Sequence, residues 1–138
     1  MNPVLKLSVP RKALYVGSYA YVGVPPAPVS AGDLARRIEQ LLGRAPLLIG
    51  DPARPAARIA WCSGGAQDYF EAALATGADL FVSGEISEQT VHLARETVMA
   101  FVAAGHHATE RYGVMALGEH LARTFGIDCE FVDIDNPV

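Results

Sequence analysis

The chain alternates between short apolar runs and segments of helical periodicity from residue 57 onward, and this alternation constrains its fold more than any other feature. Apolar runs that predict strands occupy residues 59–62, 80–83, 99–103 and 129–134. Good helix formers with helical spacing occupy residues 67–76, 87–95 and 109–125. Strands joined through helices lie parallel in one sheet, because each crossover returns the chain to the same end of the sheet. The pattern predicts an α/β fold with a largely parallel or mixed sheet flanked by helices.

The chain before this alternation carries weaker signals. Residues 1–16 combine two prolines and a Lys/Arg cluster with alternating apolar residues, which predicts an extended N-terminal arm or edge strand whose role is open. Residues 19–24 alternate as a strand does and are followed by a run of prolines. Residues 47–49 predict another short strand, and residues 51–55 a surface loop.

A helix is predicted between Ser30 and Gly43. Ser30 is of the type that caps a first helical turn, and Gly43 is of the type that ends a helix. The apolar face of this helix consists of Leu34, Ile38, Leu41 and Leu42. We expect this face to pack on the sheet, because its spacing follows the helical repeat.

The composition is that of an ordinary single-domain protein and excludes several classes of function. Of the 138 residues, 51% are hydrophobic and 19% are charged, far from the signature of disorder. A net charge of -4 and scattered arginines give no basis for binding nucleic acid. No apolar run is long enough to span a bilayer, and the N-terminus lacks the apolar core of a signal peptide. We therefore expect a cytoplasmic protein with no membrane or nucleic-acid partner.

The two cysteines, Cys62 and Cys129, both fall in predicted strands. They do not form a Cys-x-x-Cys pair, which favours a role as small buried apolar residues. A disulfide framework and a thiolate zinc site are therefore not indicated.

Three glycine-containing loops follow the predicted strands, at residues 63–66, 84–87 and 105–108. In open α/β sheets the loops at the carboxyl ends of the strands gather at one edge, where ligands bind. We expect these three loops to form the functional edge, with Glu85 of the second loop close to His106 of the third.

His106 and Glu110 carry the strongest chemical signal. They are four residues apart at the start of a predicted helix, so both side chains can lie on one helical face and approach one cation. Imidazole nitrogen and carboxylate oxygen suit zinc, manganese or iron. The spacing alone also fits a glutamate placed by the helix dipole and a histidine that caps or packs, and two ligands do not close a metal site.

Other polar groups near these loops have more than one interpretation. Glu85 fits a residue supporting a metal site, a general base, or an acid that stabilises a helix start. The Ser63-Gly64-Gly65 turn fits either a phosphate cradle or a tight strand-to-helix turn. His107 is expected to support a neighbouring strand through a hydrogen bond, His120 to lie on a helix surface, and His92 to be a supporting or structural residue.

Three ordered motifs resemble the signatures of the NIF-three family, the GTP cyclohydrolase 1 type 2-like group of dinuclear metal-binding proteins. They are Trp-Cys-Ser-Gly-Gly-Ala-Gln at residues 61–67, Ser-Gly-Glu-Ile-Ser-Glu-Gln-Thr-Val-His at 83–92 and Ala-Gly-His-His-Ala-Thr-Glu-Arg at 104–111. The closing Phe-Val-Asp-Ile-Asp-Asn-Pro at 131–137 resembles the family's last strand. The resemblance extends over residues 17–138, as the C-terminal portion of the family's α/β domain.

The resemblance implies an α/β fold, two divalent metal ions and a ring-shaped homo-hexamer. It places the family's C-terminal metal-ligating histidine and glutamate on His106 and Glu110. The family's other ligands, in a His-His-Gly segment and a later aspartate, belong to an N-terminal half without a counterpart here, and no histidine precedes His92. The metal site is therefore expected to be incomplete in this chain, which should bind zinc, manganese or iron weakly or not at all.

The resemblance also implies a metal-dependent hydrolase of the GTP cyclohydrolase type when the protein is complete, with a nucleotide substrate. In this interpretation His106 and Glu110 hold metal, and Glu85 is a catalytic group for proton transfer or a residue supporting the metal site. The alternatives are a non-catalytic, ring-forming regulatory or scaffold protein, or an inactive truncated remnant.

Overall fold

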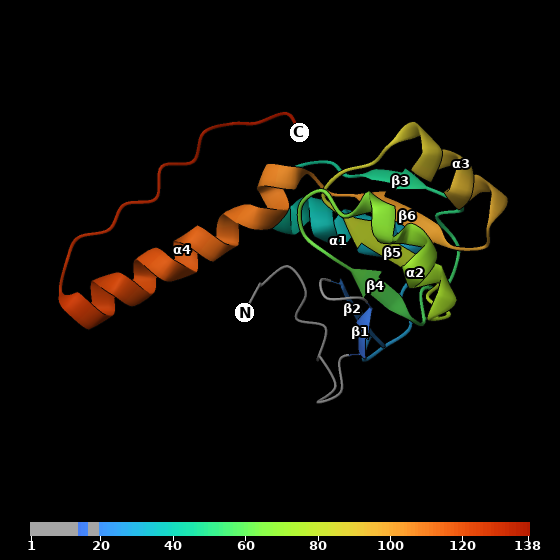
Figure 1. Ribbon diagram of the computed structural model, residues 1–138, viewed down its shortest axis with the longest axis horizontal. Coiled ribbons are helices and arrows are strands. Elements are labelled where there is room, and N and C mark those ends of the chain that lie inside the picture. Colours follow the sequence, from blue (N-terminus) through green and yellow to red (C-terminus); the bar gives the residue numbers. More distant parts are fainter. Residues whose placement is uncertain (1–13, 17–19) are drawn as a thin grey trace.

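A mixed sheet of six strands forms the centre of the computed structural model, which describes residues 14–16 and 20–138 (Figure 1). Across the sheet the strands are β1 (Leu14–Val16), β2 (Ala20–Gly23), β4 (Ile59–Trp61), β5 (Leu80–Ser83), β6 (Ala100–Ala103) and β3 (Leu47–Ile49). The three strands β4, β5 and β6 are parallel, and the outer strands β2 and β3 pair antiparallel with them. The predicted α/β fold is confirmed.

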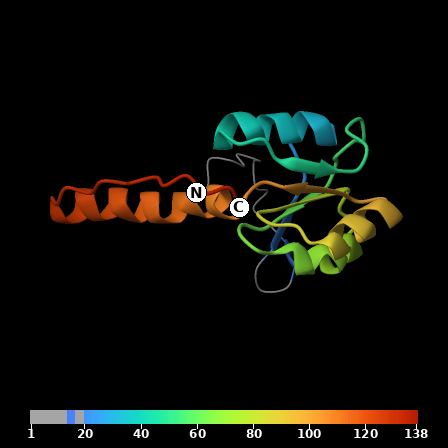
Figure 2. The same ribbon diagram turned by 90° about the horizontal axis from the view of Figure 1, so that it is seen from above.

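The parallel strands are connected through helices on one face of the sheet. A 3-10 turn, η2 (Gln67–Tyr69), and helix α2 (Phe70–Ala75) join β4 to β5, and α3 (Glu88–Glu96) joins β5 to β6. Helix α1 (Ala31–Leu42) covers the opposite face, so that the sheet lies between two helical layers (Figure 2). These elements agree with the helices and strands predicted from periodicity to within one or two residues at most ends.

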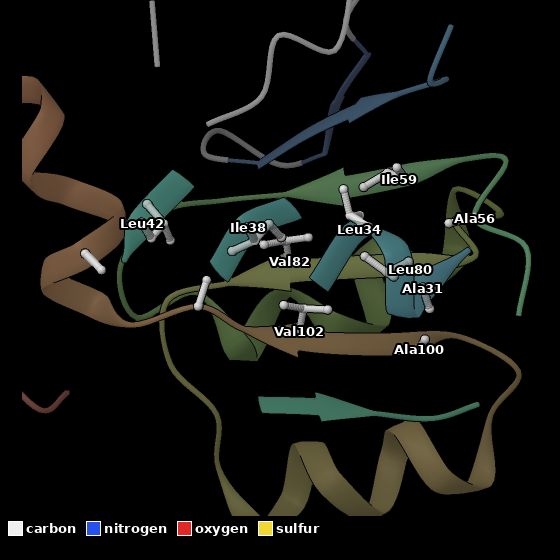
Figure 3. Packing of buried hydrophobic residues seen from close by; sticks show 12 residues of the cluster. Ala31, Leu34, Ile38, Leu42, Ala56, Ile59, Leu80, Val82, Ala100 and Val102 are labelled. Atoms are coloured by element: carbon white, nitrogen blue, oxygen red, sulfur yellow. The ribbon is translucent and has the colours of Figure 1, made fainter. Parts of the chain in front are cut away.

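Alternation along each strand builds two separate cores. Leu80 and Val82 of β5 face α1, whereas Phe81 between them packs with Phe70 of α2 and Phe101 of β6. Figure 3 shows the α1 side, where Leu34, Ile38 and Leu42 cover the inner strands. Because β5 is buried on both faces, it has the continuous apolar sequence of a central parallel strand.

Helix α1 has the ends that the sequence predicts. The hydroxyl of Ser30 accepts a hydrogen bond of 3.1 Å from the backbone N–H of Asp33, and Gly43 ends the helix at a φ of 69°. The prediction for Leu41 is wrong, because this residue is 41% exposed while Ile38 and Leu42 are buried. Leu41 lies at the rim of the apolar stripe, in the last turn of the helix.

Helix α4 (His106–Phe125) begins three residues before the predicted start at residue 109 and ends at Gly126, whose φ is 65°. It projects away from the sheet for most of its length (Figures 1 and 2). Its buried residues are Ala108 and Thr109, both in the first turn. The remaining turns therefore present apolar side chains to solvent, including Val114, Leu117 and Phe125.

The predicted strand at residues 129–134 is wrong. In the structure the C-terminal tail, residues 127–138, runs back beside α4 in extended form without strand pairing (Figure 2). A strand needs a partner for its backbone groups, and residues 127–138 pair with neither edge strand of the described sheet, β1 or β3. Cys129 is consequently exposed rather than buried, and Cys62 is half-buried just after β4.

The predicted N-terminal arm lies mostly outside the described residues, which omit 1–13 and 17–19. Leu14–Val16 form β1 at one edge of the sheet, as expected for an edge strand. None of the helices in the described part of the chain combines the length and apolar character that a membrane crossing requires.

Candidate functional site at the carboxyl ends of the parallel strands

Three glycine loops meet at the carboxyl ends of β4, β5 and β6, as predicted. The backbone N–H of Gly84 donates to the carbonyl of Gly64 at 2.8 Å, and the N–H of Gly105 donates to the carbonyl of Gly84 at 2.9 Å. The loops therefore form one connected layer, because each is tied to the next through its backbone.

Two of these positions favour glycine for different reasons. A Cβ atom on Gly84 would lie 2.6 Å from the carbonyl oxygen of Gly64 and 2.9 Å from Cα of His106, so space requires glycine there. Gly64 has a left-handed φ of +67°, and a Cβ atom on it would displace the carboxylate of Glu110. The loops can approach the start of α4 this closely because these glycines have no side chains.

His106 lies between two carboxylates at this edge of the sheet. Its Nδ1 is 2.5 Å from Oε1 of Glu85, and its Nε2 is 3.1 Å from Oε2 of Glu110. All three side chains are partly accessible, with exposed fractions of 40% for His106, 34% for Glu85 and 51% for Glu110. The predicted convergence of His106 with Glu110, and its predicted closeness to Glu85, are confirmed.

This arrangement raises the pKa of His106. The largest cause is the hydrogen bond to Glu85, which favours the charged imidazolium, and the negative charges of Glu110 and Glu85 act in the same direction. Partial burial opposes them. The imidazole is therefore surrounded by groups that favour a positive charge on it or next to it.

Ser83 and Thr109 hold the glycine loop in position, and the sequence alone did not identify either. The buried hydroxyl of Thr109 accepts from the N–H of Gly64 at 3.0 Å and donates to the carbonyl of His106 at 3.0 Å. The buried hydroxyl of Ser83 accepts from the N–H of Ala66 and donates to the carbonyl of Gly64, both at 3.2 Å. Their positions in the sequence could have indicated this role, because Ser83 is a polar residue at the end of a buried strand and Thr109 lies in the first turn of a helix.

These bonds bear on the two interpretations of residues 63–65. The backbone N–H groups of Gly64 and Ala66 are already bonded within the protein. The carboxylate of Glu85 also lies beside Gly65, where a Cβ atom would be 3.3 Å from its Oε2. The loop therefore fits a tight strand-to-helix turn that supports the acidic groups better than it fits a phosphate cradle.

The other histidines have partners other than Glu85 and Glu110. His107 pairs with Asp133 of the tail at 2.8 Å, rather than supporting a strand as expected. His92 pairs with Glu88 of its own helix at 3.8 Å, which fits the structural role predicted as one of its two options. His120 is exposed on α4, as predicted.

A cleft of about 470 Å³ opens over His106. Its lining includes Glu85, His106 and Glu110, together with Asn136 and Val138 of the tail. Its size is within the range of small-molecule sites.

Two side chains, not three, are placed to share one cation in this cleft. Glu85 contacts the Nδ1 side of the ring, whereas Glu110 faces Nε2. Among residues 14–16 and 20–138, no three His, Cys, Asp or Glu side chains form a group able to hold a metal ion. The 3.1 Å between Nε2 and Oε2 is a separation that one cation with bonds of about 2.1 Å can bridge, so the pair fits part of a metal site.

The fold and this edge define an α/β protein with a His-carboxylate cluster at the ends of its parallel strands. Residues 10–137 match the model of the family described as Duf34/NIF3 (NGG1p interacting factor 3), and the chain belongs to that family.

Curated relatives named "GTP cyclohydrolase 1 type 2 homolog" are similar over most of the chain. The Pseudomonas aeruginosa protein is 51% identical over 93% of this chain and 48% of its own length. The Neisseria meningitidis serogroup B protein is 55% identical over 77% of this chain and 43% of its own length. The chain therefore spans about half the length of the curated relatives it matches.

Solved structures of similar proteins agree with this fold. The protein ybgI, described as of unknown function, is 44% identical, with a TM-score of 0.85 over 92% of this chain and 52% of its own. The protein TTHA1606 from Thermus thermophilus is 29% identical, with a TM-score of 0.71 over 87% of this chain and 47% of its own. The similarity to ybgI also covers about half of that chain.

Proposed function

We propose that this chain supplies two ligands, Nε2 of His106 and the carboxylate of Glu110, to a divalent-metal centre, with Glu85 holding His106 in position. The observation that carries the proposal is the location of one imidazole between two carboxylates, at 2.5 Å from Glu85 and 3.1 Å from Glu110.

The proton positions explain why a cation is needed there. An ionised carboxylate only accepts hydrogen bonds, so the contact with Glu85 requires the proton on Nδ1. In the neutral ring Nε2 then carries a lone pair that points at a second carboxylate, Glu110. Two acceptors at 3.1 Å repel each other unless a proton or a metal ion lies between them. Protonation and metal binding are therefore alternatives at Nε2.

Glu85 has the role that a carboxylate commonly has beside a metal-bound histidine. By accepting a hydrogen bond from Nδ1–H, it fixes the tautomer and the ring orientation and makes the lone pair of Nε2 a stronger metal ligand. Its Oε2 also lies against Gly65, so the glycine turn restricts where this carboxylate can move. In this proposal Glu85 is a positioning residue rather than the catalytic group that the sequence suggested as one option.

A complete centre needs more ligands than this chain's described residues provide. A metal held by one histidine and one glutamate keeps most of its water and binds weakly. We therefore propose that further ligands come from a longer chain or a second copy.

The reaction we propose is a metal-dependent hydrolysis. The name of the curated relatives, "GTP cyclohydrolase 1 type 2 homolog", supports a nucleotide substrate of the GTP type. A bound divalent metal would supply an activated water at neutral pH. The chain's own groups would hold the metal and keep the Nδ1 proton on His106, and the cleft of about 470 Å³ would admit part of the substrate.

Metal analysis and an activity assay together test this proposal. The chain and a longer form that matches the full length of the relatives are loaded with zinc or manganese and assayed for GTP hydrolysis. We expect weakly bound metal at most in this chain, tightly bound metal in the longer form and activity only in the longer form, with His106→Ala lowering both readouts. Tightly bound metal without turnover in the longer form would instead support the regulatory or scaffold alternative.

We also propose that the chain associates with a second copy through the outer turns of α4. This 20-residue helix buries only two of its described residues, and Val114, Leu117 and Phe125 are 55% or more exposed. Long helices are stabilised mainly by packing of an apolar face, which favours covering of this one. Light scattering at micromolar concentration tests the proposal. We expect an oligomer that Leu117→Glu weakens, and a strict monomer would contradict it.

A further inference from the structure

Three side chains with positive or hydrogen-bond-donating groups converge on the C-terminal tail next to the candidate metal cleft. Arg44, in the loop after α1, donates to the carbonyl oxygens of Asn136 at 3.2 Å and Pro137 at 2.6 Å. His107 and Arg111, one turn apart on α4, both bind the carboxylate of Asp133 at 2.8 Å. We refer to Arg44, His107 and Arg111 as the basic triad.

We propose that the basic triad is a binding site for a phosphate group, which Asp133 of the tail occupies when no ligand is bound. The phosphate group would belong to the small molecule bound in the adjoining cleft. The identification of that molecule as a substrate rests on the proposed function, whereas the anion site itself does not depend on any metal.

The position of the triad supports this assignment. A pocket of about 380 Å³ is lined by Arg44, His107 and Arg111 together with residues of the tail. It shares His107, Arg111 and Asn136 with the cleft over His106. A ligand held in the cleft could therefore extend a phosphate group into this pocket.

Asp133 already occupies the pocket as an anion. Its two carboxylate oxygens bind separate donors, Oδ1 to His107 and Oδ2 to Arg111. Phosphate oxygens bind arginine with the same charge-assisted geometry, and a neutral imidazole can also donate from Nε2. The chemistry that binds this carboxylate is thus suited to phosphate.

Two contacts of Arg111 do not depend on Asp133. One of its guanidinium nitrogens donates to the carbonyl of Leu42 at 2.7 Å, and its side chain is only 20% exposed. Its guanidinium also lies 5.6 Å from the centre of the Tyr112 ring. Arg111 is therefore held ready for an anion, because these contacts do not involve the tail.

The tail is held in a way that allows exchange. Asp133 is 44% exposed, and the flanking Val132 and Ile134 are 68% and 74% exposed, so little apolar surface holds this stretch. Exposed ion pairs of this kind contribute little to stability. Both acidic residues that line the pocket, Asp133 and Asp135, belong to the tail. When the tail moves, the pocket loses its negative groups and keeps its positive ones.

Titration of the metal-free chain with inorganic phosphate at fixed neutral pH, followed by amide NMR, tests this inference. Asp133→Asn removes the competing charge while keeping the side-chain shape, and we expect phosphate to bind about five-fold more tightly than to the unmodified chain. The affected amides should be those near residues 44, 107 and 111. Arg111→Met, or Arg44→Met if the first variant does not fold, should abolish the gain in the Asp133→Asn background.

A matched control completes the experiment. Arg123→Met removes an exposed arginine near the far end of the same helix and should leave phosphate binding unchanged. The chain is kept free of metal throughout, which separates this inference from the metal proposal. The inference is overturned if Asp133→Asn binds phosphate no more tightly than the unmodified chain, or if Arg123→Met weakens binding as much as Arg111→Met.

Discussion

His106 and Glu85 are 21 residues apart in the chain, and in the folded protein Nδ1 of the imidazole lies 2.5 Å from Oε1 of the carboxylate. The contact exists because parallel pairing of β5 with β6 places the loops that follow them side by side. It places the proton of the neutral ring on Nδ1 of His106 and leaves Nε2 facing Glu110. The first two predictions depend on this contact.

The substitution Glu85→Gln should lower the pKa of His106 and weaken zinc binding by about 10- to 100-fold, because the amide keeps the size of the side chain but loses its charge. NMR titration of the imidazole and calorimetry with zinc measure the two effects. Glu88→Gln is the matched control, since Glu88 is 92% exposed and pairs with His92. Equal zinc affinity in all three proteins would show that Glu85 does not position the ligand.

Zinc affinity should rise with pH through a pKa above the ordinary 6.5 of histidine, because the proton and the metal compete for Nε2. The direction of this pH dependence follows from the raised pKa of His106. Interactions that favour the imidazolium are fully present at low pH and are lost as pH rises through the folded-state pKa, where the ring becomes free for metal. In Glu85→Gln the rise should move to lower pH. Calorimetry in a pH series measures it, and affinity that stays constant between about pH 6 and 8 would contradict it.

Gly84→Ala should cost more stability than Gly43→Ala, although only Gly43 has a left-handed φ, 69°. Placing alanine in this conformation costs about 1–2 kcal/mol at Gly43, where a Cβ atom meets nothing within 4 Å. At Gly84 a Cβ atom would lie 2.6 Å from the carbonyl oxygen of Gly64 and 2.9 Å from Cα of His106, so that the backbone has to shift. Urea denaturation measures the difference. Equal losses would mean that the glycine loops do not pack tightly against each other.

Ile38→Ala should lower the free energy of unfolding by about 2–5 kcal/mol, because Ile38 is 1% exposed in the core between α1 and the sheet. Leu41→Ala, three residues further along the same helix and 41% exposed, should cost less than about 1 kcal/mol. Thermal and urea unfolding of both variants measure this. Similar losses would place Leu41 in the core, as the sequence had suggested.

Much of the fold could be predicted from sequence because its signals are local. The continuous apolar run of β5 shows a strand buried on both faces, and Ser30 and Gly43 mark the ends of α1 through bonds within one turn. The tail could not be predicted in this way. Its apolar alternation fits a strand, but a strand forms only beside a free partner edge, and no local residue reports where that edge lies.

The candidate site also combines contacts that the sequence predicts with contacts that it does not predict. The closeness of Glu85, His106 and Glu110 follows from the order of strands and from helical spacing, both of which can be read from sequence. The contact of His107 with Asp133 could not be predicted, because it depends on where the tail returns. The metal-binding role of His106 and Glu110 came from the resemblance to a family and stays a prediction.

The central claim is that Nε2 of His106 and the carboxylate of Glu110 share one divalent cation. The most direct test is a zinc titration of this chain followed by nitrogen NMR of the imidazole rings, with His106→Ala and Glu110→Gln as comparisons. We expect weak binding that shifts Nε2 of His106, leaves its Nδ1 protonated, and is reduced in Glu110→Gln. Zinc binding that leaves His106 unchanged, or that shifts Nδ1 in place of Nε2, would contradict the claim.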